Sequence, residues 1–266
     1  MEQFIYKKSA GITVLSANMT EFKYKKHAHE EYAIGVTLRG IQHYTLDGGL
    51  QLSYPNGVMI FNPEQAHDGM AHDGMAHDHS GLEYVMLYVE PQLFLEAAHQ
   101  KDVVQFSQPI VYDRMLKQQI LSLSYHVLNE KDEALCIELF LSLTDRLFQV
   151  DSIAIADAKQ DNRFISIAKD MLRANLDQVL MLDDICRELE CSKFQFIRMF
   201  KAHTGISPYQ YFLNCKVERA KQIIEASRDI YLAVAACGFV DLTHLNRHFK
   251  SVYGLTAYEY MTHIHR

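Results

Sequence analysis

The residues best suited to chemistry lie near the carboxyl end of the chain, where one short pattern occurs twice. Residues 198–201 read Arg-Met-Phe-Lys and residues 247–250 read Arg-His-Phe-Lys, 49 positions further on. An arginine can donate two hydrogen bonds to one guanine edge, and a lysine can neutralise a phosphate. A repeated pair of this kind predicts contact with double-stranded nucleic acid at two places.

The elements around each pair have the same order. A short apolar helix, a tight turn and a second helix are followed by a glycine and a new helix start, over residues 182–209 and again over 230–258. This order predicts two helix-turn-helix units. Duplication is a repeat-level signal, so an ordinary solvated helix face is the weaker interpretation of these polar residues.

The second helix of each unit, here called a probe helix, has a polar and an apolar side. Ser192 caps the first probe helix, whose inward face we expect to be Phe196, Met199 and Phe200. The second, about 241–253, should bury Leu245, Phe249 and Val252. The candidate DNA-contacting residues are Ser192, Lys193, Gln195, Arg198, Lys201, Thr243, His244, Asn246, Arg247 and Lys250.

The helix between the two units has a length that suits this role. Ser207-Pro208 supplies a cap and a first-turn proline for a helix that we expect to run to about Ala226. Some ~19 residues at a rise of 1.5 Å span close to 30 Å. Successive major-groove segments on one face of DNA lie ~34 Å apart, so both probe helices could enter the groove together.

Composition places the chain among globular proteins of two-domain size. It has 266 residues, 48% of them hydrophobic, and a net charge of −7. The acidic residues concentrate before residue 163 and the remainder is mildly basic, which indicates that only the back half meets a polyanion. Five scattered cysteines without a CxxC pair, no signal-like segment and no long apolar run predict a cytoplasmic protein without a membrane span.

The first 90 residues predict β structure. Short runs rich in β-branched and aromatic residues are separated by turn residues such as Asp47-Gly48 and Asn56-Gly57, which favours a small barrel or sandwich. The expected strands cover residues 12–15, 32–38, 43–46, 50–53, 58–61 and 84–89.

A five-residue unit repeats between two of these strands, over residues 66–79, and contains His67, His72, His77 and His79. Such a cluster invites a metal-binding interpretation. A tandem duplication that lengthens a surface loop explains it better, because loop closure costs little extra entropy with length.

Helical periodicity replaces the strand pattern after Pro91. A helix begins near Leu93, and two longer helices are expected over 112–128 and 133–150, with stripes at Met115, Ile120, Leu123 and Val127 and at Leu135, Leu139, Leu143 and Leu147. The stripes suit a core or a dimer seam equally.

These patterns together divide the chain into three parts. We expect an effector-binding and dimerisation domain at 1–150, a polar linker at 151–162 and an all-α DNA-binding domain at 163–266.

The back half resembles AraC/XylS-type transcription regulators. The resemblance covers nearly all of residues 164–264 and rests on the segments 198–201, 204–209, 218–221, 236–241 and 247–250 with Gly254. It implies two helix-turn-helix motifs on a seven-helix domain, operator binding, RNA polymerase as a partner and, usually, activation. Ala257 and Leu245 stand where the family commonly has proline and phenylalanine, and both differences look structural.

The front half resembles the cupin-like β-barrel of the same family, through residues 31–40, 55–63 and 87–91. The resemblance implies a small polar effector and no catalysis. By this likeness Arg39 matches an effector-contacting arginine, and Tyr84 and Met86 fall on a pocket-lining strand. A guanidinium suits a hydroxyl or carboxylate ligand, although a surface ion pair is the alternative role for Arg39. The candidate ligand-binding residues are His29, Arg39, His67, Tyr84 and Met86.

One competing interpretation of the front half remains open. His27 and His29 lie at positions i and i+2, with His67 later in the chain, as in metal-binding cupin enzymes. The carboxylate spacing departs from the enzyme pattern, and fusion to two helix-turn-helix units argues against an enzyme. We expect no metal and no cofactor, with a metal-binding protein or metalloenzyme that uses His27, His29 and His67 as the alternative.

Overall fold

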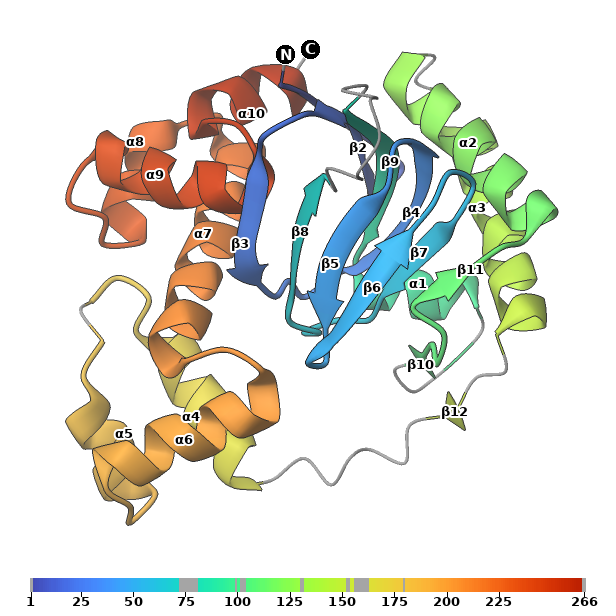
Figure 1. The fold of residues 1–266 in the computed structure, drawn as a ribbon. Helices are drawn as coiled ribbons and strands as arrows, with labels where there is room; N and C mark the ends of the chain where they lie inside the picture. Colours follow the sequence, from blue (N-terminus) through green and yellow to red (C-terminus); the bar gives the residue numbers. More distant parts are fainter. Residues whose placement is uncertain are drawn as a thin grey trace. The chain divides into compact units, whose positions relative to one another are not determined.

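Strands fill the first part of the chain and helices the last, as the sequence predicts (Figure 1). The computed structural model describes residues 2–71, 81–98, 100, 104–129, 132–151, 154–155, 163–178 and 180–264. Two compact units are distinguished, one comprising residues 1–23 and 30–156 and the other residues 24–29 and 157–266.

Two β-sheets make up most of the β structure before residue 112. The six-stranded sheet has the order β1 (Gln3–Ser9), β2 (Ile12–Met19), β9 (Leu82–Val89), β4 (Tyr32–Arg39), β7 (Val58–Phe61) and β11 (Ile110–Val111). The four-stranded sheet has the order β3 (Lys23–His27), β8 (His67–Ala71), β5 (Gln42–Leu46) and β6 (Gly49–Ser53). The cupin-like expectation is confirmed, in the form of a two-sheet sandwich rather than one closed barrel.

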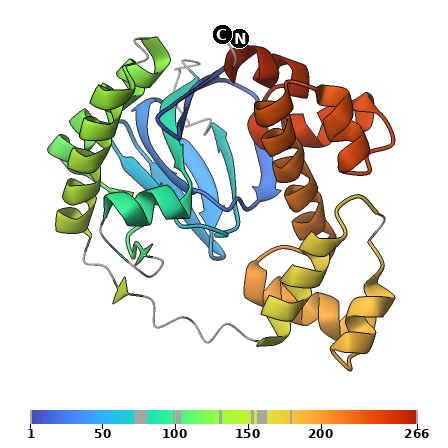
Figure 2. The same cartoon turned by 180° about the vertical axis from the view of Figure 1, so that it is seen from behind.

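Side-chain alternation decides what each face of the six-stranded sheet contacts. Successive side chains point to opposite faces of a strand. In β9, Val85, Leu87 and Val89 belong to one large core cluster with helices α1 (Pro91–Ala97), α2 (Arg114–Asn129) and α3 (Glu133–Val150). Figures 1 and 2 show α2 and α3 side by side along this face of the sheet. Tyr84 and Met86 therefore point to the opposite face.

The two long helices bury most of the predicted stripes, including Ile120, Leu123 and Val127 in α2 and Leu143 and Leu147 in α3. The differences lie in the N-terminal part of each helix. Met115 is 58% exposed, and Leu116 is buried in its place. In α3, Cys136 and Phe140 are buried and the expected Leu135 and Leu139 are only half-buried. Both adjacent positions are apolar, so the sequence pattern alone did not distinguish the two phases.

Six strands of the described residues lie outside the runs predicted from the sequence. Three of them have only two residues each, and the longer three are β1, β3 and β8. β1 and β3 are edge strands with several lysines, and charged side chains are common on sheet edges. β8 covers His67–Ala71, so the start of the five-residue repeat is a strand and not a surface loop. The remaining histidines of the repeat, His72, His77 and His79, lie outside the described residues.

The segment after α3 stays attached to the first unit for longer than expected. Asp151, assigned to the linker from sequence, is fully buried and accepts hydrogen bonds from the backbone N–H groups of Ser107 and Gln108 and from the Ser107 hydroxyl. Strand β12 (Ala154–Ile155) pairs with β10 (Val104–Gln105). The part of the predicted linker over residues 156–162 lies outside the described residues.

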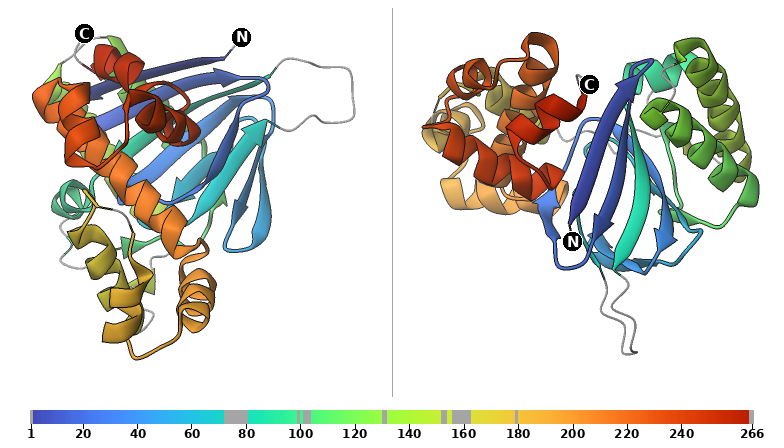
Figure 3. Two further views of the ribbon diagram at one scale, coloured as in Figure 1. Left: turned by 90° about the vertical axis from the view of Figure 1, so that its left-hand side faces the viewer. Right: turned by 90° about the horizontal axis from the view of Figure 1, so that it is seen from above.

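The second unit contains helices α4 to α10 (Figure 3). The first helix-turn-helix is α5 (Leu182–Glu188) with α6 (Lys193–Thr204), and the second is α8 (Ile230–Ala236) with α9 (Leu242–Tyr253). The other three are α4 (Arg163–Ala174), α7 (Pro208–Ser227) and α10 (Ala257–Ile264). None of the helices in the described residues combines the length and apolarity that crossing a bilayer requires.

The connecting helix α7 begins as predicted and carries buried charge. Ser207 accepts a hydrogen bond from the Gln210 N–H in a capping box, with Pro208 in the first turn. Lys216 is buried with its ammonium 4.9 Å from the Phe212 ring, and burial lowers its pKa. Such a contact partly compensates a desolvated charge, so Lys216 belongs to the core and not to a DNA-binding surface.

Candidate functional site

The first probe helix, α6, is fixed at both ends by local hydrogen bonds. The Ser192 side chain accepts from the Gln195 N–H, and the Gln195 side chain accepts from the Ser192 N–H. Gly205, with φ 77°, ends the helix in the left-handed conformation that glycine adopts without strain. Phe196 and Phe200 are fully buried. One side of α6 is therefore held in the core, and the opposite side faces solvent.

The solvent side of α6 presents Phe194, Arg198 and Lys201, all exposed, at positions i, i+4 and i+7. Residues with this spacing line one face of a helix. Phe194 is 82% exposed, which is unusual for an aromatic ring and leaves it free to contact a partner. The face thus combines an arginine suited to a guanine edge, a lysine suited to a phosphate and an exposed apolar ring.

The second probe helix, α9, is built in the same way. The Asp241 side chain accepts a hydrogen bond from the His244 N–H, and Gly254 ends the helix with φ 80°. Leu245, Phe249 and Tyr253 are buried on one side. The opposite side presents Thr243, Arg247 and Lys250, all exposed. These three lie at the positions of α9 that correspond to Phe194, Arg198 and Lys201 of α6.

Two predicted contact residues have structural partners instead. The Asn246 side-chain oxygen accepts a hydrogen bond from the Ala257 N–H at the start of α10, 3.0 Å away. The Gln195 amide oxygen closes the capping box of α6. The expectation that both amides point outward to read adenine is corrected for Asn246, and for Gln195 any base contact competes with the cap.

Lys193 and Met199 also differ from the expected pattern. The Lys193 ammonium lies 2.7 Å from an Asp183 carboxylate oxygen in an exposed ion pair. Such surface pairs contribute little, so a phosphate can replace the carboxylate. Met199, expected on the inward face, is 41% exposed. Phe194, Ile197 and Val240 are exposed, and their exposure was not predicted. Their apolar character next to polar helix starts was a signal that the sequence offered.

A small aromatic cluster supports the start of α9. The rings of His244 and His248 lie 4.9 Å apart, and both contact Phe239. Burial, followed by the nearby His244 and Arg247, lowers the pKa of His248 to about 4. The cluster therefore holds a neutral His248 behind the exposed face, and His244 is half-buried rather than outward.

The ligand-binding residues predicted in the front half of the chain do not all lie together. Tyr84 and Met86 are buried on the sheet face opposite the helices, and Gly35 leaves the room that the Met86 side chain occupies. His29 and His67 are also buried. Arg39, in contrast, is exposed at the end of β4, with its Nε 3.5 Å from a Glu83 carboxylate oxygen. The structure thus gives Arg39 a surface ion pair and does not place it among the buried residues.

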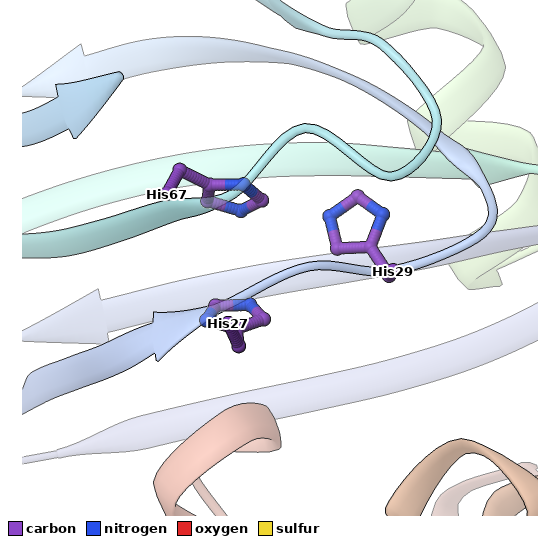
Figure 4. Close-up of side chains that lie close together, drawn as sticks. All are labelled: His27, His29 and His67. Carbon is purple, nitrogen blue, oxygen red and sulfur yellow. The ribbon is translucent and has the colours of Figure 1, made fainter. Parts of the chain in front are cut away.

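Three histidines approach one another at the edge of the four-stranded sheet (Figure 4). His27 ends β3, His67 begins the neighbouring strand β8, and His29 follows β3 by two residues. All three are buried, and one ring nitrogen from each lies within 4.8 Å of the other two. Three imidazoles in this arrangement are a recognised donor set for first-row transition metals.

Comparison with known proteins agrees with both halves of this description. A model of the AraC-like ligand binding domain matches residues 9–144, and a helix-turn-helix domain model matches residues 185–263. The chain belongs to the AraC family of transcription regulators. In this AraC-family protein, the second match contains both probe helices and the first contains the three histidines. The family is one of DNA-binding regulators and not of enzymes, which decides against the metalloenzyme interpretation.

Individual relatives are distant. The chain is 24% identical over 229 residues to the uncharacterised helix-turn-helix regulator YbfI of Bacillus subtilis, which covers 84% of this chain and 82% of that protein. It is 34% identical over 90 residues to the MmsAB operon regulatory protein of Pseudomonas aeruginosa, covering 34% of this chain and 29% of that one. Among solved structures, ToxT of Vibrio cholerae with bound unsaturated fatty acid has a TM-score of 0.60 at 13% identity, covering 95% of each chain. That likeness concerns the fold alone.

Proposed function

We propose that this AraC-family regulator binds its operator through α6 and α9, which enter two successive segments of the major groove. The equivalent exposed faces of the two helices carry the proposal most directly. Each face has an arginine and a lysine at i and i+3, behind a capped helix start. A helix-turn-helix reads bases mainly with the N-terminal part of its second helix, and both arginines lie in the first half of that helix.

Each exposed residue has a role that follows from its chemistry. Arg198 and Arg247 each suit a bidentate contact with guanine, and Lys201 and Lys250 suit phosphates. Phe194 and Thr243, at corresponding positions, are both able to pack against a thymine methyl group. The difference between an aromatic ring and a threonine predicts that the two halves of the operator have different sequences.

The connecting helix supports simultaneous binding. Helix α7 has 20 residues, and at a rise of about 1.5 Å it spans roughly 30 Å. Adjacent major-groove segments on one face of the duplex lie about 34 Å apart. A spacer of this length is suited to holding two helices one helical turn apart on DNA.

The first unit, in this proposal, binds a small polar effector that alters DNA binding. His29, His67, Tyr84 and Met86 are the buried residues proposed to contact it, and the match to a ligand-binding domain supports this role. Arg39 is left out because it is exposed and paired with Glu83.

Dimerisation and activation complete the proposal. Helices α2 and α3 expose several large apolar side chains, which is consistent with a homodimer formed through residues 112–150. These side chains are Met115, Tyr125, Ile137 and Leu141, and Tyr112 is exposed just before α2. We propose that the bound regulator recruits RNA polymerase and activates transcription, as the family resemblance implies.

Operator selection followed by footprinting tests the central step. Genomic fragments retained by the full-length protein should contain one asymmetric site with two protected major-groove patches about 10–10.5 base pairs apart. A single protected patch would exclude simultaneous binding by α6 and α9. Transcription from the selected promoter with purified RNA polymerase should rise when the regulator is added, and a fall would exclude activation.

A further inference from the structure

His27, His29 and His67 form a buried cluster to which the proposed DNA-binding function assigns no role of its own. The exposed fractions of these side chains are 6%, 8% and 7%. His27 and His67 lie on the neighbouring strands β3 and β8, so the sheet itself brings together residues that are 40 positions apart. Figure 4 shows the three rings turned toward a common region.

The hydrogen bonds of two rings indicate which nitrogen could serve as a metal ligand. The Nδ1 of His27 lies 2.7 Å from the Lys25 carbonyl oxygen, and the Nδ1 of His67 lies 2.8 Å from the Gln65 carbonyl oxygen. A carbonyl oxygen can only accept, so each Nδ1 carries the proton. In the neutral ring the other nitrogen, Nε2, then carries the lone pair that a metal ion would accept. Metal-binding histidines are oriented in the same way, by donating their other N–H to a backbone carbonyl.

The distances suit one ion. Metal–nitrogen bonds of about 2.0–2.1 Å place any two ligands of one ion no more than about 4.2 Å apart. The three candidate ligand atoms already lie within 4.8 Å of one another, so a movement of less than about 1 Å would bring them to one centre. His67 is also held by stacking on Phe61, with ring centroids 4.3 Å apart, which limits its freedom before any ion binds.

We propose that His27, His29 and His67 bind one divalent first-row transition-metal ion through their imidazole nitrogens. Three protein ligands leave at least one position open for water or another ligand, which distinguishes the site from a closed structural zinc site. A soft or oxygen-preferring ion such as Cu⁺ or Mg²⁺ is not expected, because imidazole favours zinc, iron, nickel and divalent copper. His29 and His67 are also proposed to contact the effector. The inference rests on the proposed function only through these two shared residues.

Other histidines of the chain must be separated from this site. The repeat contributes His72, His77 and His79, whose imidazoles are also potential metal ligands. The triple variant H72Q/H77Q/H79Q removes them and keeps His67. The double variant H27Q/H67Q removes two of the three proposed ligands and keeps the rest of the repeat, so the two variants form a matched pair.

The test is a zinc titration of the full-length protein against a competing chelator, with Co²⁺ as a spectroscopic probe. We expect one Zn²⁺ per chain in the wild type and in H72Q/H77Q/H79Q. In H27Q/H67Q the affinity should fall by more than the roughly 10–100-fold that changes in outer-shell partners cost. The Co²⁺ complex of wild type and of H72Q/H77Q/H79Q should show the visible absorption of a nitrogen-ligated ion.

Loss of binding in H72Q/H77Q/H79Q with retention in H27Q/H67Q would overturn the proposal, as would a wild type that holds no ion against the chelator. If H27Q/H67Q does not fold by circular dichroism, the single variant H29Q takes its place. The titration uses neither DNA nor an effector. A regulator that binds its operator but no metal therefore overturns only this inference, and one that binds metal but no operator overturns only the proposed function.

Discussion

Arg198 and Arg247 occupy equivalent positions in two separate helices. Each is the sixth residue of a twelve-residue helix, and each helix ends at a glycine with φ near 80°. In both, a polar side chain caps the N-terminus. Two apolar residues are buried on the side away from the arginine, Phe196 and Phe200 in α6 and Leu245 and Phe249 in α9. The duplication seen in the sequence is therefore also present in the structure, where each helix carries one arginine at the same position.

This equivalence predicts similar losses when either arginine is removed. R198A and R247A should each weaken specific operator binding by about 1–3 kcal/mol and relax the preference at one base pair, because a bidentate base contact is lost. Affinities for the operator and for single-base variants, measured at one salt concentration, provide the test. R187A, an exposed arginine paired with Asp184 on α5, removes the same charge and should leave base preference unchanged. Equal base preferences in all four proteins would contradict the assignment.

Lys201 is predicted to act on phosphate and not on bases. K201A should weaken binding to specific and unrelated DNA alike, and should reduce the slope of log affinity against log salt concentration by about 1. The slope is obtained from titrations at four or five salt concentrations. K117A, which removes a lysine bonded to Asn56 in the first unit, is the control and should keep the wild-type slope. A loss confined to the specific site would show that Lys201 contacts a base.

The cap of α9 is predicted to contribute to stability independently of any DNA contact. Asp241 accepts a hydrogen bond of 2.7 Å from the His244 N–H. D241A leaves that donor without its cap and should lower the free energy of unfolding by ~1 kcal/mol. D241N retains an acceptor of similar capping strength and should be close to wild type. Urea unfolding followed by circular dichroism measures the difference, and equal losses in both variants would point to the charge of Asp241 rather than to its cap.

Local signals in the sequence were sufficient for most elements. Strand β7 and helix α3 have the predicted bounds, because turn residues or a capping aspartate mark their starts. Strands β1 and β3 were missed because lysines interrupt the apolar alternation, and edge strands tolerate such charges. Ala257 and Leu245, the two departures from the family pattern, are fully buried, as a structural role requires.

Local signals in the sequence could not predict contacts between distant parts of the chain. Asn246 has the polarity of an outward residue, and only packing of α10 against α9 shows that it binds the Ala257 N–H. Lys216 is buried over an aromatic ring, where a lysine is rarely expected. The approach of His67 to His27 and His29 depends on the pairing of β8 with β3, and neither of these strands was predicted.

His248 predicts a specific loss of stability in mild acid. Burial lowers its pKa to about 4 in the folded protein, whereas the ordinary value is 6.5. Between these two values the unfolded chain binds the proton more readily, so stability falls as the pH drops from about 6.5 toward 4. H248Q removes this titration and should flatten the pH dependence of the urea midpoint in that window. Above about pH 6.5 both states hold the neutral ring, so the wild-type and H248Q profiles should run parallel there. Parallel profiles through the whole range from pH 4 to 8 would show that His248 titrates equally in the folded and unfolded states.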